Sequence, residues 1–461
     1  MGSAENSAPL ISDGTRALAR YIAGALQQQV PQEVIEKAKN HLLDTLAAMV
    51  SGSRLRAGRL AAQYVQQLGG SGNCTVAGTA IKTSAVDAAL ANGMMGHGDE
   101  TDDSHLGGRF HPGCGIVPCV LASAELRGSS GLAVLRAVAL GYDIGTRFNL
   151  SLGPRKLYAG GHSTHSVGPL FGGAAAAGAL LHFDEEEIRY LLSYAVQQAS
   201  GVQCWSRDEH HVEKAFDFGG MPARNAMAAA TMVAAGFTGV PDALAGPNNF
   251  FSAFSTDPRP NELWRELGTR YEIQQASIKK WCVGSPIQGA IDAILALMQQ
   301  HALRPENLSR LVIDMPDDRC ELVNNRNMPN INVQHLVALT LLDGGLSFES
   351  SHDHERMNDP QLLQVRQKIE LVPNAALTSA MPARQVIISA HTHDGQVMSH
   401  HTKAVRGTPD DPMSRGEVMD KAMDLMAPIL GSGRARDLVQ QVVGLDALDN
   451  ASAAISPLLT A

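Results

Sequence analysis

The segment from Asn92 to Gly115, NGMMGHGDETDDSHLGGRFHPGCG, is unusually dense in side chains that can transfer protons. Imidazoles and carboxylates are the usual general acids and bases near neutral pH, and glycines let the backbone approach a ligand closely. A buried charge costs several kcal/mol unless it is paired, so neither an amphipathic helix nor a half-buried strand explains this pattern. We therefore predict an active-site loop, whose candidate residues are His97, Asp99, Glu100, Asp102, Asp103, His105, Arg109 and His111.

Four later stretches also place polar side chains among glycine and alanine. They are GGHSTHSVGPLFGG at 160–173, HHVEKAFDFGGMPARNA at 210–226, SIKKWCVGSPIQGAIDA at 277–293 and NINVQHLVALTLLDGG at 330–345. Their cations can pair with the carboxylates of a small anionic substrate, and their imidazoles can move protons together with the loop acids. That combination suits abstraction of a proton next to a carboxylate, with loss of water or CO2. The residues concerned are His162, Lys214, Arg224, Lys279, Lys280 and His335.

Other interpretations of these residues remain open. The loop contains the ligand types of a zinc, iron or manganese site, although its spacing matches no compact motif such as HExxH. Asp102 and Asp103 could instead cap a helix or a turn, and His210 and His211 are expected at the surface. The chain lacks a GxSxG elbow, a Walker sequence and a GxGxxG after a strand, so we expect no nucleotide cofactor.

Helices are expected to position most of these groups. Asp13 can cap the first of them, and Asp184 with Glu187 forms a capping-box-like pair before another. Two segments around the active-site loop are apolar on nearly all sides, which is typical of helices buried in a large domain. Helical periodicity runs through 12–28, 32–50, 58–68, 84–95, 116–126, 132–149, 170–182 and 223–235.

The pattern changes near Trp264. Strand-like segments lie at 271–277, 308–315, 367–372 and 385–390, with a hairpin turn at 394–397, and helices are expected at 286–301, 333–342, 411–430 and 434–444. We therefore predict a mostly α-helical fold with an all-helical domain over 1–267 and a smaller α/β domain over 268–405. C-terminal helices over 406–461 return to the helical domain.

Composition excludes several classes of protein. The 461 residues favour two domains, and a net charge of -9 without a Lys/Arg block argues against nucleic acid as a partner. No apolar run of about 18 residues is present, and the N-terminus MGSAENSAPL has no signal-peptide pattern, so no membrane contact is expected. The six cysteines include no CxxC pair, which favours free thiols in a reducing cytoplasm.

The polar stretches, taken in order, resemble the MmgE/PrpD family, which includes 2-methylcitrate dehydratase, cis-aconitate decarboxylase and iminodisuccinate epimerase. The resemblance runs from about residue 15 to about residue 430. Its anchors are NGMMGH, DDSH and HPG within 92–113, GGHSTHSVGPLFGGAAAAG at 160–178, EKAFDFGGMPARNAMAAATMVAAGFTG at 213–239, IKKWCVGSPIQGAIDA at 278–293 and INVQHLVALTLLDG at 331–344.

The resemblance implies a large helical domain closed by the terminal segments, an α/β lid domain, a homodimer and a site without metal or organic cofactor. It assigns catalytic roles to His111, His162 and Lys214, and a role to either Lys279 or Lys280. The chain also departs from the family pattern. ETDDS stands for the usual DFDDT, so Glu100 takes the place of the active-site aspartate and Ser104 replaces threonine, while His335 aligns with a tyrosine of the decarboxylase branch.

We therefore predict a cofactor-independent lyase, foremost a dehydratase that resembles 2-methylcitrate dehydratase and acts on a small di- or tricarboxylic acid. His111 would transfer the proton with help from Glu100 or Asp102, and His162 would position the substrate or leaving group. Substrate-binding groups would be Lys214, Ser104, Arg224, Lys279 or Lys280, and His335. The alternatives are a decarboxylase of a cis-aconitate-like acid, an epimerase of an iminodisuccinate-like acid, a metal-dependent hydrolase and a non-catalytic carboxylate-binding protein.

Overall fold

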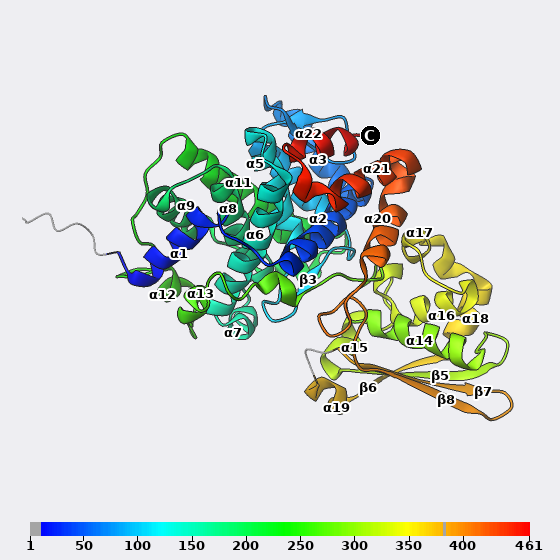
Figure 1. Ribbon diagram of the computed structural model, residues 1–461. Coiled ribbons are helices and arrows are strands. Elements are labelled where there is room, and N and C mark those ends of the chain that lie inside the picture. Colours follow the sequence, from blue (N-terminus) through cyan, green and yellow to red (C-terminus); the bar gives the residue numbers. More distant parts are fainter. Residues whose placement is uncertain (1–10, 381–383) are drawn as a thin grey trace, which may run out of the picture. The chain divides into compact units, whose positions relative to one another are not determined.

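The chain forms two compact units. The computed structural model describes residues 11–380 and 384–461. The expectation that the N-terminus carries no signal peptide concerns residues 1–10, which lie outside the described residues. One unit comprises the chain up to Ala276 together with Leu425–Ala461, and the other is Ser277–Asp424 (Figure 1). The first unit is helical and the second contains a mixed sheet, which confirms the predicted mostly α-helical fold class. No described helix is both long and apolar enough to cross a membrane.

The helices of the first unit follow the apolar periodicity of the sequence. The predicted capping box is confirmed at α9, but Ser12 rather than Asp13 caps α1, because the Ser12 hydroxyl accepts the backbone N–H of Thr15. The helices are α1 Asp13–Gly24, α2 Gln32–Gly52, α3 Arg56–Leu68, α4 Ala85–Gly96, α5 Gly113–Arg127, α6 Gly131–Ser151, α7 Pro154–Ala159, α8 Thr164–Leu180, α9 Glu185–Gln198, α10 Val212–Ala215, α11 Met221–Ala234, α12 Phe250–Phe254, α13 Asn261–Trp264, α21 Ser432–Val443 and α22 Ala451–Ile455. Short strands are β1 Cys74–Thr75, β2 Lys82–Thr83 and β3 Ser104–His105.

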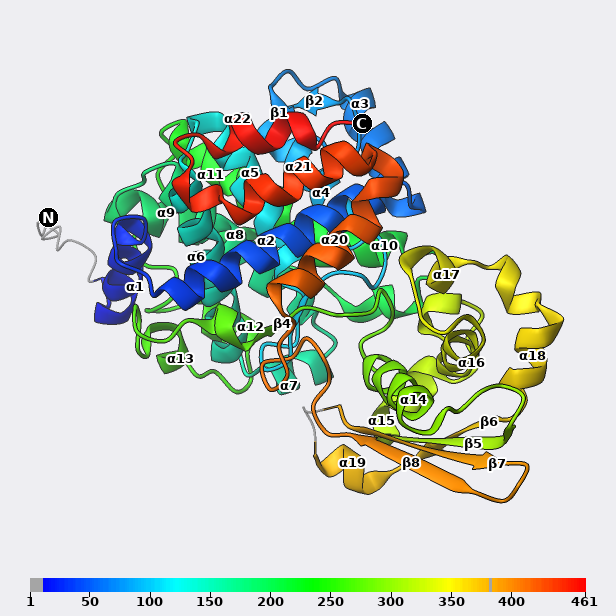
Figure 2. The same ribbon diagram turned by 45° about the vertical axis from the view of Figure 1, so that its right-hand side comes forward.

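Three nearly all-buried helices, α5, α6 and α8, form the centre of this unit. α6 and α8 approach closely because glycines face each other: a β-carbon at Gly172 would lie 2.4 Å from the Gly141 carbonyl oxygen. Near the C-terminus, α21 packs on α2 and α22 packs on α5 (Figures 1 and 2). The end of the chain therefore covers helices from its beginning, and α22 is a further helix after the one predicted at 434–444.

The second unit is built on a four-stranded sheet with the order β6-β5-β7-β8. β5 runs parallel to β6 and antiparallel to β7, and the predicted hairpin joins β7 to β8. The strands are β5 Leu308–Met315, β6 Ile369–Pro373, β7 Val386–Thr392 and β8 Val397–Thr402. The helices are α14 Gln288–His301, α15 Asp317–Val323, α16 Val333–Asp343, α17 Phe348–His352, α18 Pro360–Arg366, α19 Ala375–Ser379 and α20 Arg415–Leu430, within which the chain passes back to the first unit.

One face of this sheet is buried beneath α14, with α16 packed beside it (Figure 2). The register sets Leu311 opposite Ile369 on one side and Ala390 on the other, so apolar side chains line up across three strands. β7 alternates buried and half-buried residues, as a strand with one covered face does. The apolar alternation of these segments therefore explains the sheet.

The strand predicted at 271–277 is wrong. Glu272–Gln275 forms a 3-10 turn, and only Ala276–Ser277 has strand geometry, as β4. The reason is a hydrogen bond to a side chain: the backbone N–H of Glu272 donates to the buried carboxylate of Asp143 at 3.2 Å.

Candidate active site

The active-site loop predicted between residues 92 and 115 is folded into the first unit. Ser84 caps α4, which ends at Gly96, and α5 begins at Gly113, so the acids and imidazoles occupy the connection between two helices. Its residues Asp99, Glu100, Asp102, Asp103, His105 and His111 are all buried. Buried charges of this kind require partners, and the partners define what each residue does.

Asp102 bridges two imidazoles. One carboxylate oxygen lies 3.0 Å from Nδ1 of His111, and the other lies 2.9 Å from Nδ1 of His97. Asp102 is 0% exposed, so water does not screen these contacts. A carboxylate at Nδ1 favours the tautomer that carries the proton there and directs Nε2 of His111 away from Asp102 as the proton-accepting atom. Asp102 and His111 thus form a dyad suited to general acid–base catalysis.

The neighbouring Asp103 has a different role. Its carboxylate accepts from Tyr142 at 2.5 Å and lies 2.6 Å from Nδ1 of His41, and all three side chains are fully buried. It also accepts the backbone N–H of Gly113, the first residue of α5, at 2.9 Å. The interpretation that one acid of this pair caps a helix is therefore confirmed for Asp103, which anchors α5 to the fold.

Lys214 reaches the loop from α10, 114 residues further along the chain, and its ammonium group pairs with the carboxylate of Glu100. The ammonium nitrogen also lies 5.2 Å from the ring centre of Phe218 and 5.7 Å from that of Trp205. Aromatic faces attract a cation but form no directional bond with it. The positive charge of Lys214 is therefore held beside the active-site loop, while its ammonium N–H groups can exchange one carboxylate partner for another.

Phe218 organises the imidazoles. Its ring stacks on His165 at 3.7 Å between centroids and on His97 at 4.3 Å. Phe218 lies on a π-helical turn, Phe216–Gly220, which is a feature often found at functional sites. This turn packs tightly on α4: a β-carbon at Gly93 would lie 2.4 Å from the Gly219 carbonyl oxygen, so only glycine fits there.

Two further histidines belong to this cluster. The ring of His165 lies 5.4 Å from that of His111, and the ring of His211 lies 5.0 Å from that of His97. Burial lowers the pKa of His165 well below its usual value, and burial together with the charge of Lys214 lowers the pKa of His211 to about 3. Both rings are therefore neutral near pH 7.

His211 is half-buried, with Nε2 shielded from solvent, rather than at the surface as expected, whereas His210 is exposed. The backbone of His211 is left-handed, with φ of 56°, and this turn before α10 separates the environments of the two neighbours. Residue type cannot reveal which of two adjacent histidines adopts this left-handed conformation, because histidine tolerates it at either position. The sequence marks His165 only as a member of the stretch 160–173, whereas its stacking on Phe218 is decided by tertiary contacts.

Several predicted residues of this unit lie apart from the dyad in their contacts. His162 is exposed, with its ring 6.1 Å from that of Phe254. Arg224 on α11 donates to the side chain of Asn225 at 2.9 Å. Ser104 is buried in β3.

The remaining predicted residues belong to the second unit. Lys279 is buried, whereas Lys280 pairs with Glu417 at 3.3 Å. His335 is fully buried near the start of α16, where its backbone N–H donates to the Asn332 side chain, and burial lowers its pKa to about 4. Their roles in substrate binding stay predictions.

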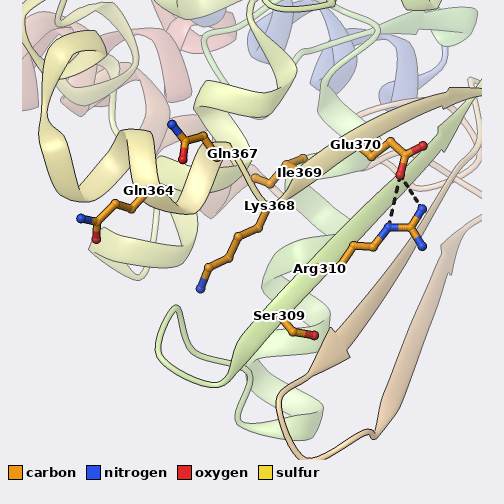
Figure 3. Close-up of a pocket in the computed structure, with 7 residues that line it drawn as sticks. All are labelled: Ser309, Arg310, Gln364, Gln367, Lys368, Ile369 and Glu370. Atoms are coloured by element: carbon orange, nitrogen blue, oxygen red, sulfur yellow. Dashed lines mark hydrogen bonds and ion pairs between the residues drawn. The ribbon is translucent and has the colours of Figure 1, made fainter.

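A groove of about 580 Å³ also lies on the second unit (Figure 3). Arg310 in this groove is paired with Glu370, and Lys368 donates to the carbonyl oxygen of Leu308 at 2.6 Å. None of the predicted site residues lines it. Its charges are engaged in holding β5 and β6, so this groove is not the candidate active site.

Asp217, on the same π-helical turn as Phe218, makes stability depend on pH. It is 6% exposed, and burial raises its pKa from 3.8 to about 7, although Ser163 donates a hydrogen bond to its carboxylate. Between these two values the folded protein binds more protons than the unfolded chain, so this contribution to stability falls as pH rises through that window.

Asp217→Asn should therefore stabilise the protein by roughly 2–4 kcal/mol at pH 8 and have little effect at pH 4. Thermal unfolding of wild type and variant at the two pH values measures this difference. Asp437→Asn, at an exposed position of α21, serves as the control and should shift neither value. An equal effect of Asp217→Asn at both pH values would contradict the raised pKa.

The fold and the site together describe a protein with a helical unit, which carries an Asp–His dyad suited to acid–base catalysis, and a separate α/β unit. Comparison with protein-family models is consistent with this description. Residues 16–263 match the MmgE/PrpD N-terminal domain, and residues 281–445 match the MmgE/PrpD C-terminal domain. The chain therefore belongs to the MmgE/PrpD family, which confirms the resemblance found in its sequence, and it is a lyase-type enzyme of that family.

Curated relatives align over nearly the whole chain. A cis-aconitate decarboxylase-like protein, oryM, from Aspergillus oryzae is 23% identical over 96% of this chain and 96% of its own length. Cis-aconitate decarboxylase from Aspergillus terreus is 23% identical over 96% of this chain and 95% of its own, and the human enzyme is 24% identical over 95% and 93%. Each of these alignments covers nearly the full length of both proteins.

Proposed function

We propose that this protein is a cofactor-independent lyase that acts on a small di- or tricarboxylic acid. The observation that carries the proposal is the Asp102–His111 dyad beside the pair of Lys214 and Glu100. It combines a group that moves a proton with a cation that binds a carboxylate, which are the two requirements of chemistry next to a carboxylate. Membership in a family that acts on small carboxylic acids supports the same class of substrate.

Substrate binding would proceed by exchange of carboxylates at Lys214. A carboxylate of the substrate replaces Glu100 as the partner of the ammonium group, so the charge of Lys214 stays compensated throughout. Glu100, once released, is a second carboxylate within the site and can hold the departing group or its proton. The acid in this position is aspartate in the family pattern, and glutamate reaches further by one methylene.

In the dehydratase reaction, Nε2 of His111 takes the proton from the carbon next to the bound carboxylate. The electron pair of that C–H bond forms the carbon–carbon double bond as the bond to the hydroxyl group on the adjacent carbon breaks. The hydroxyl leaves as water with a proton from an acid of the site; our candidate is Glu100, which takes up a proton once it is released from Lys214 and then donates it. Asp102 stabilises the imidazolium of His111 during this step.

Decarboxylation is the second candidate, because the named relatives are cis-aconitate decarboxylases. Here the carbon–carbon bond to one carboxylate breaks, CO2 leaves, and the electron pair that remains on carbon takes a proton from His111. The same dyad would act as the acid rather than the base. Product analysis separates the two reactions, because one releases water and the other CO2.

The remaining predicted residues would complete substrate binding in this proposal. His162 would position the substrate or the leaving group, and the others would hold its polar groups; these are Ser104, Arg224, Lys279 or Lys280, and His335. We also expect a homodimer, as the family resemblance implies.

A turnover screen of the metal-stripped protein tests the proposal. 2-Methylcitrate, citrate, cis-aconitate, tartrate-type and iminodisuccinate-type acids are incubated with it, and products are followed by mass spectrometry. Loss of about 18 mass units identifies a dehydratase, loss of about 44 a decarboxylase, and inversion without mass change an epimerase. Turnover only after a metal is restored would show a metal-dependent enzyme. Tight binding without turnover would show a carboxylate-binding protein, and either result would overturn the proposal.

Lys214→Met should raise KM for the anionic substrate by about 10- to 100-fold with a smaller change in kcat, because binding of the substrate carboxylate is lost. Steady-state kinetics of the variant measure both constants. Lys156→Met, at an exposed lysine of α7, is the matched control and should leave both unchanged. Unaltered KM and kcat in Lys214→Met would remove this lysine from the site.

A further inference from the structure

Three side chains at the edge of the cluster offer ligand atoms to one point. His97, Glu100 and His211 each present one nitrogen or carboxylate oxygen within 4.8 Å of those of the other two. Among the described residues, Nε2 of His97 and Nε2 of His211 are buried and have no hydrogen-bond partner. Buried polar atoms without a partner are rare, and each one calls for an explanation such as an ion.

The surroundings of His97 match those of a metal ligand. Its side chain is 0% exposed, and its Nδ1 is engaged by Asp102 at 2.9 Å, which directs the proton to Nδ1 and a lone pair to Nε2. Metal-binding histidines almost always have their second nitrogen bonded to a carboxylate or carbonyl in this way. The imidazole is thus oriented before any ligand arrives.

The charges around this point also suit a cation. Asp99 and Asp102 are buried close to Glu100 in the chain, and Lys214 is the positive group paired with Glu100. A dication that took over Glu100 would have to displace the ammonium group of Lys214.

We propose that His97, Glu100 and His211 form an inhibitory binding site for a single first-row transition-metal ion, with Zn2+ as the best fit. Two imidazoles and one carboxylate suit Zn2+ and disfavour Mg2+ or Ca2+, which prefer oxygen ligands. Ligands about 2.0–2.2 Å from zinc lie roughly 3.4 Å apart, so the three side chains would close by little more than 1 Å. The inhibition, unlike the binding, rests on the proposed lyase function.

Inhibition follows from what the ion removes. The ion holds Glu100, the proposed acid for the leaving hydroxyl group, and its charge attracts the substrate carboxylate away from Lys214. It also lies beside His97, whose ring is 4.9 Å from that of His111, so a proton on His111 becomes less favourable. The site therefore opposes both steps that the proposed reaction needs, and His211 takes part in neither.

The binding test is calorimetric titration of Zn2+ into the metal-stripped full chain. We expect one equivalent bound with a Kd of about 1 μM or tighter in wild type, and binding weakened about 100-fold or more in His211→Gln. His210→Gln changes the exposed neighbour and should bind as wild type does. Absence of saturable binding, or equal binding in both variants, would overturn the site.

Two further readouts keep the result decisive. If His211→Gln does not fold, Co2+ added to wild type should give the visible absorption of four-coordinate Co2+, bleached by one equivalent of Zn2+; a six-coordinate spectrum would overturn the site. With an active substrate, Zn2+ should inhibit wild type and His210→Gln but not His211→Gln, and activation by Zn2+ would overturn the inhibitory role. If no acid is turned over, the lyase proposal fails while the titration still decides the metal site.

Discussion

His111→Gln is expected to lower kcat by about two to four orders of magnitude, the usual contribution of a general acid or base. Glutamine can still hydrogen-bond to Asp102, so the side chain remains in place, but an amide cannot accept the substrate proton. In the structure Nδ1 of His111 is held by the carboxylate of Asp102, and this orients the ring for proton transfer at its other nitrogen. KM should change much less than kcat, because binding of the substrate charge belongs to Lys214.

Single-turnover and steady-state kinetics on the substrate found by the screen measure this effect, and thermal unfolding verifies that the variant is folded. His210→Gln provides a histidine-to-glutamine control at an exposed position, where full activity is expected. Near-normal turnover by His111→Gln would end the assignment of His111 as the proton-transfer group. The dyad would then be a structural pair, and another imidazole of the cluster would have to be tested.

Asp102→Asn should cause the second large loss, about two to four orders of magnitude in kcat. An asparagine neither stabilises the imidazolium of His111 nor enforces the tautomer with the proton on Nδ1. The effect should depend strongly on His111: adding His111→Gln to Asp102→Asn should lower kcat little further, because the two residues act as one unit. Full multiplication of the two losses would show that they act independently and would contradict the dyad.

The adjacent Asp103→Asn is the matched control. Its carboxylate holds His41, Tyr142 and the start of α5, so removal of the charge should destabilise the fold by about 3–5 kcal/mol. The kcat of the protein that remains folded should change little. If Asp103→Asn instead removed activity without loss of stability, the division of roles between the two aspartates would be wrong.

Local patterns in the sequence were sufficient for the class of fold. The predicted strand over 308–315 coincides with β5, and the capping box of Asp184 and Glu187 begins α9 where expected. These features depend on residues within a few positions of one another, through the helical repeat, the alternation of a strand and the hydrogen bonds of a cap. The family can also be recognised from local sequence, because its motifs are continuous stretches of the chain.

Sequence also marked the buried loop between α4 and α5 as the place for chemistry, from the density of its acids and imidazoles. It could not divide the work within that loop. Asp102 and Asp103 are the same residue type at neighbouring positions, yet one contacts His111 and the other contacts His41 and Tyr142 from distant helices. Local chemistry is identical for both, so only long-range partners distinguish them.

The composition of the cluster was likewise decided by tertiary contacts. Lys214 meets Glu100 across 114 residues of chain. His165 is stacked on Phe218, whereas His162 three residues earlier is exposed, and a left-handed turn separates half-buried His211 from exposed His210. The sequence determined which side chains were available for the cluster, because residue type is a property of each position alone. The packing of distant helices decided which of them meet, because burial and pairing depend on neighbours that no local pattern specifies.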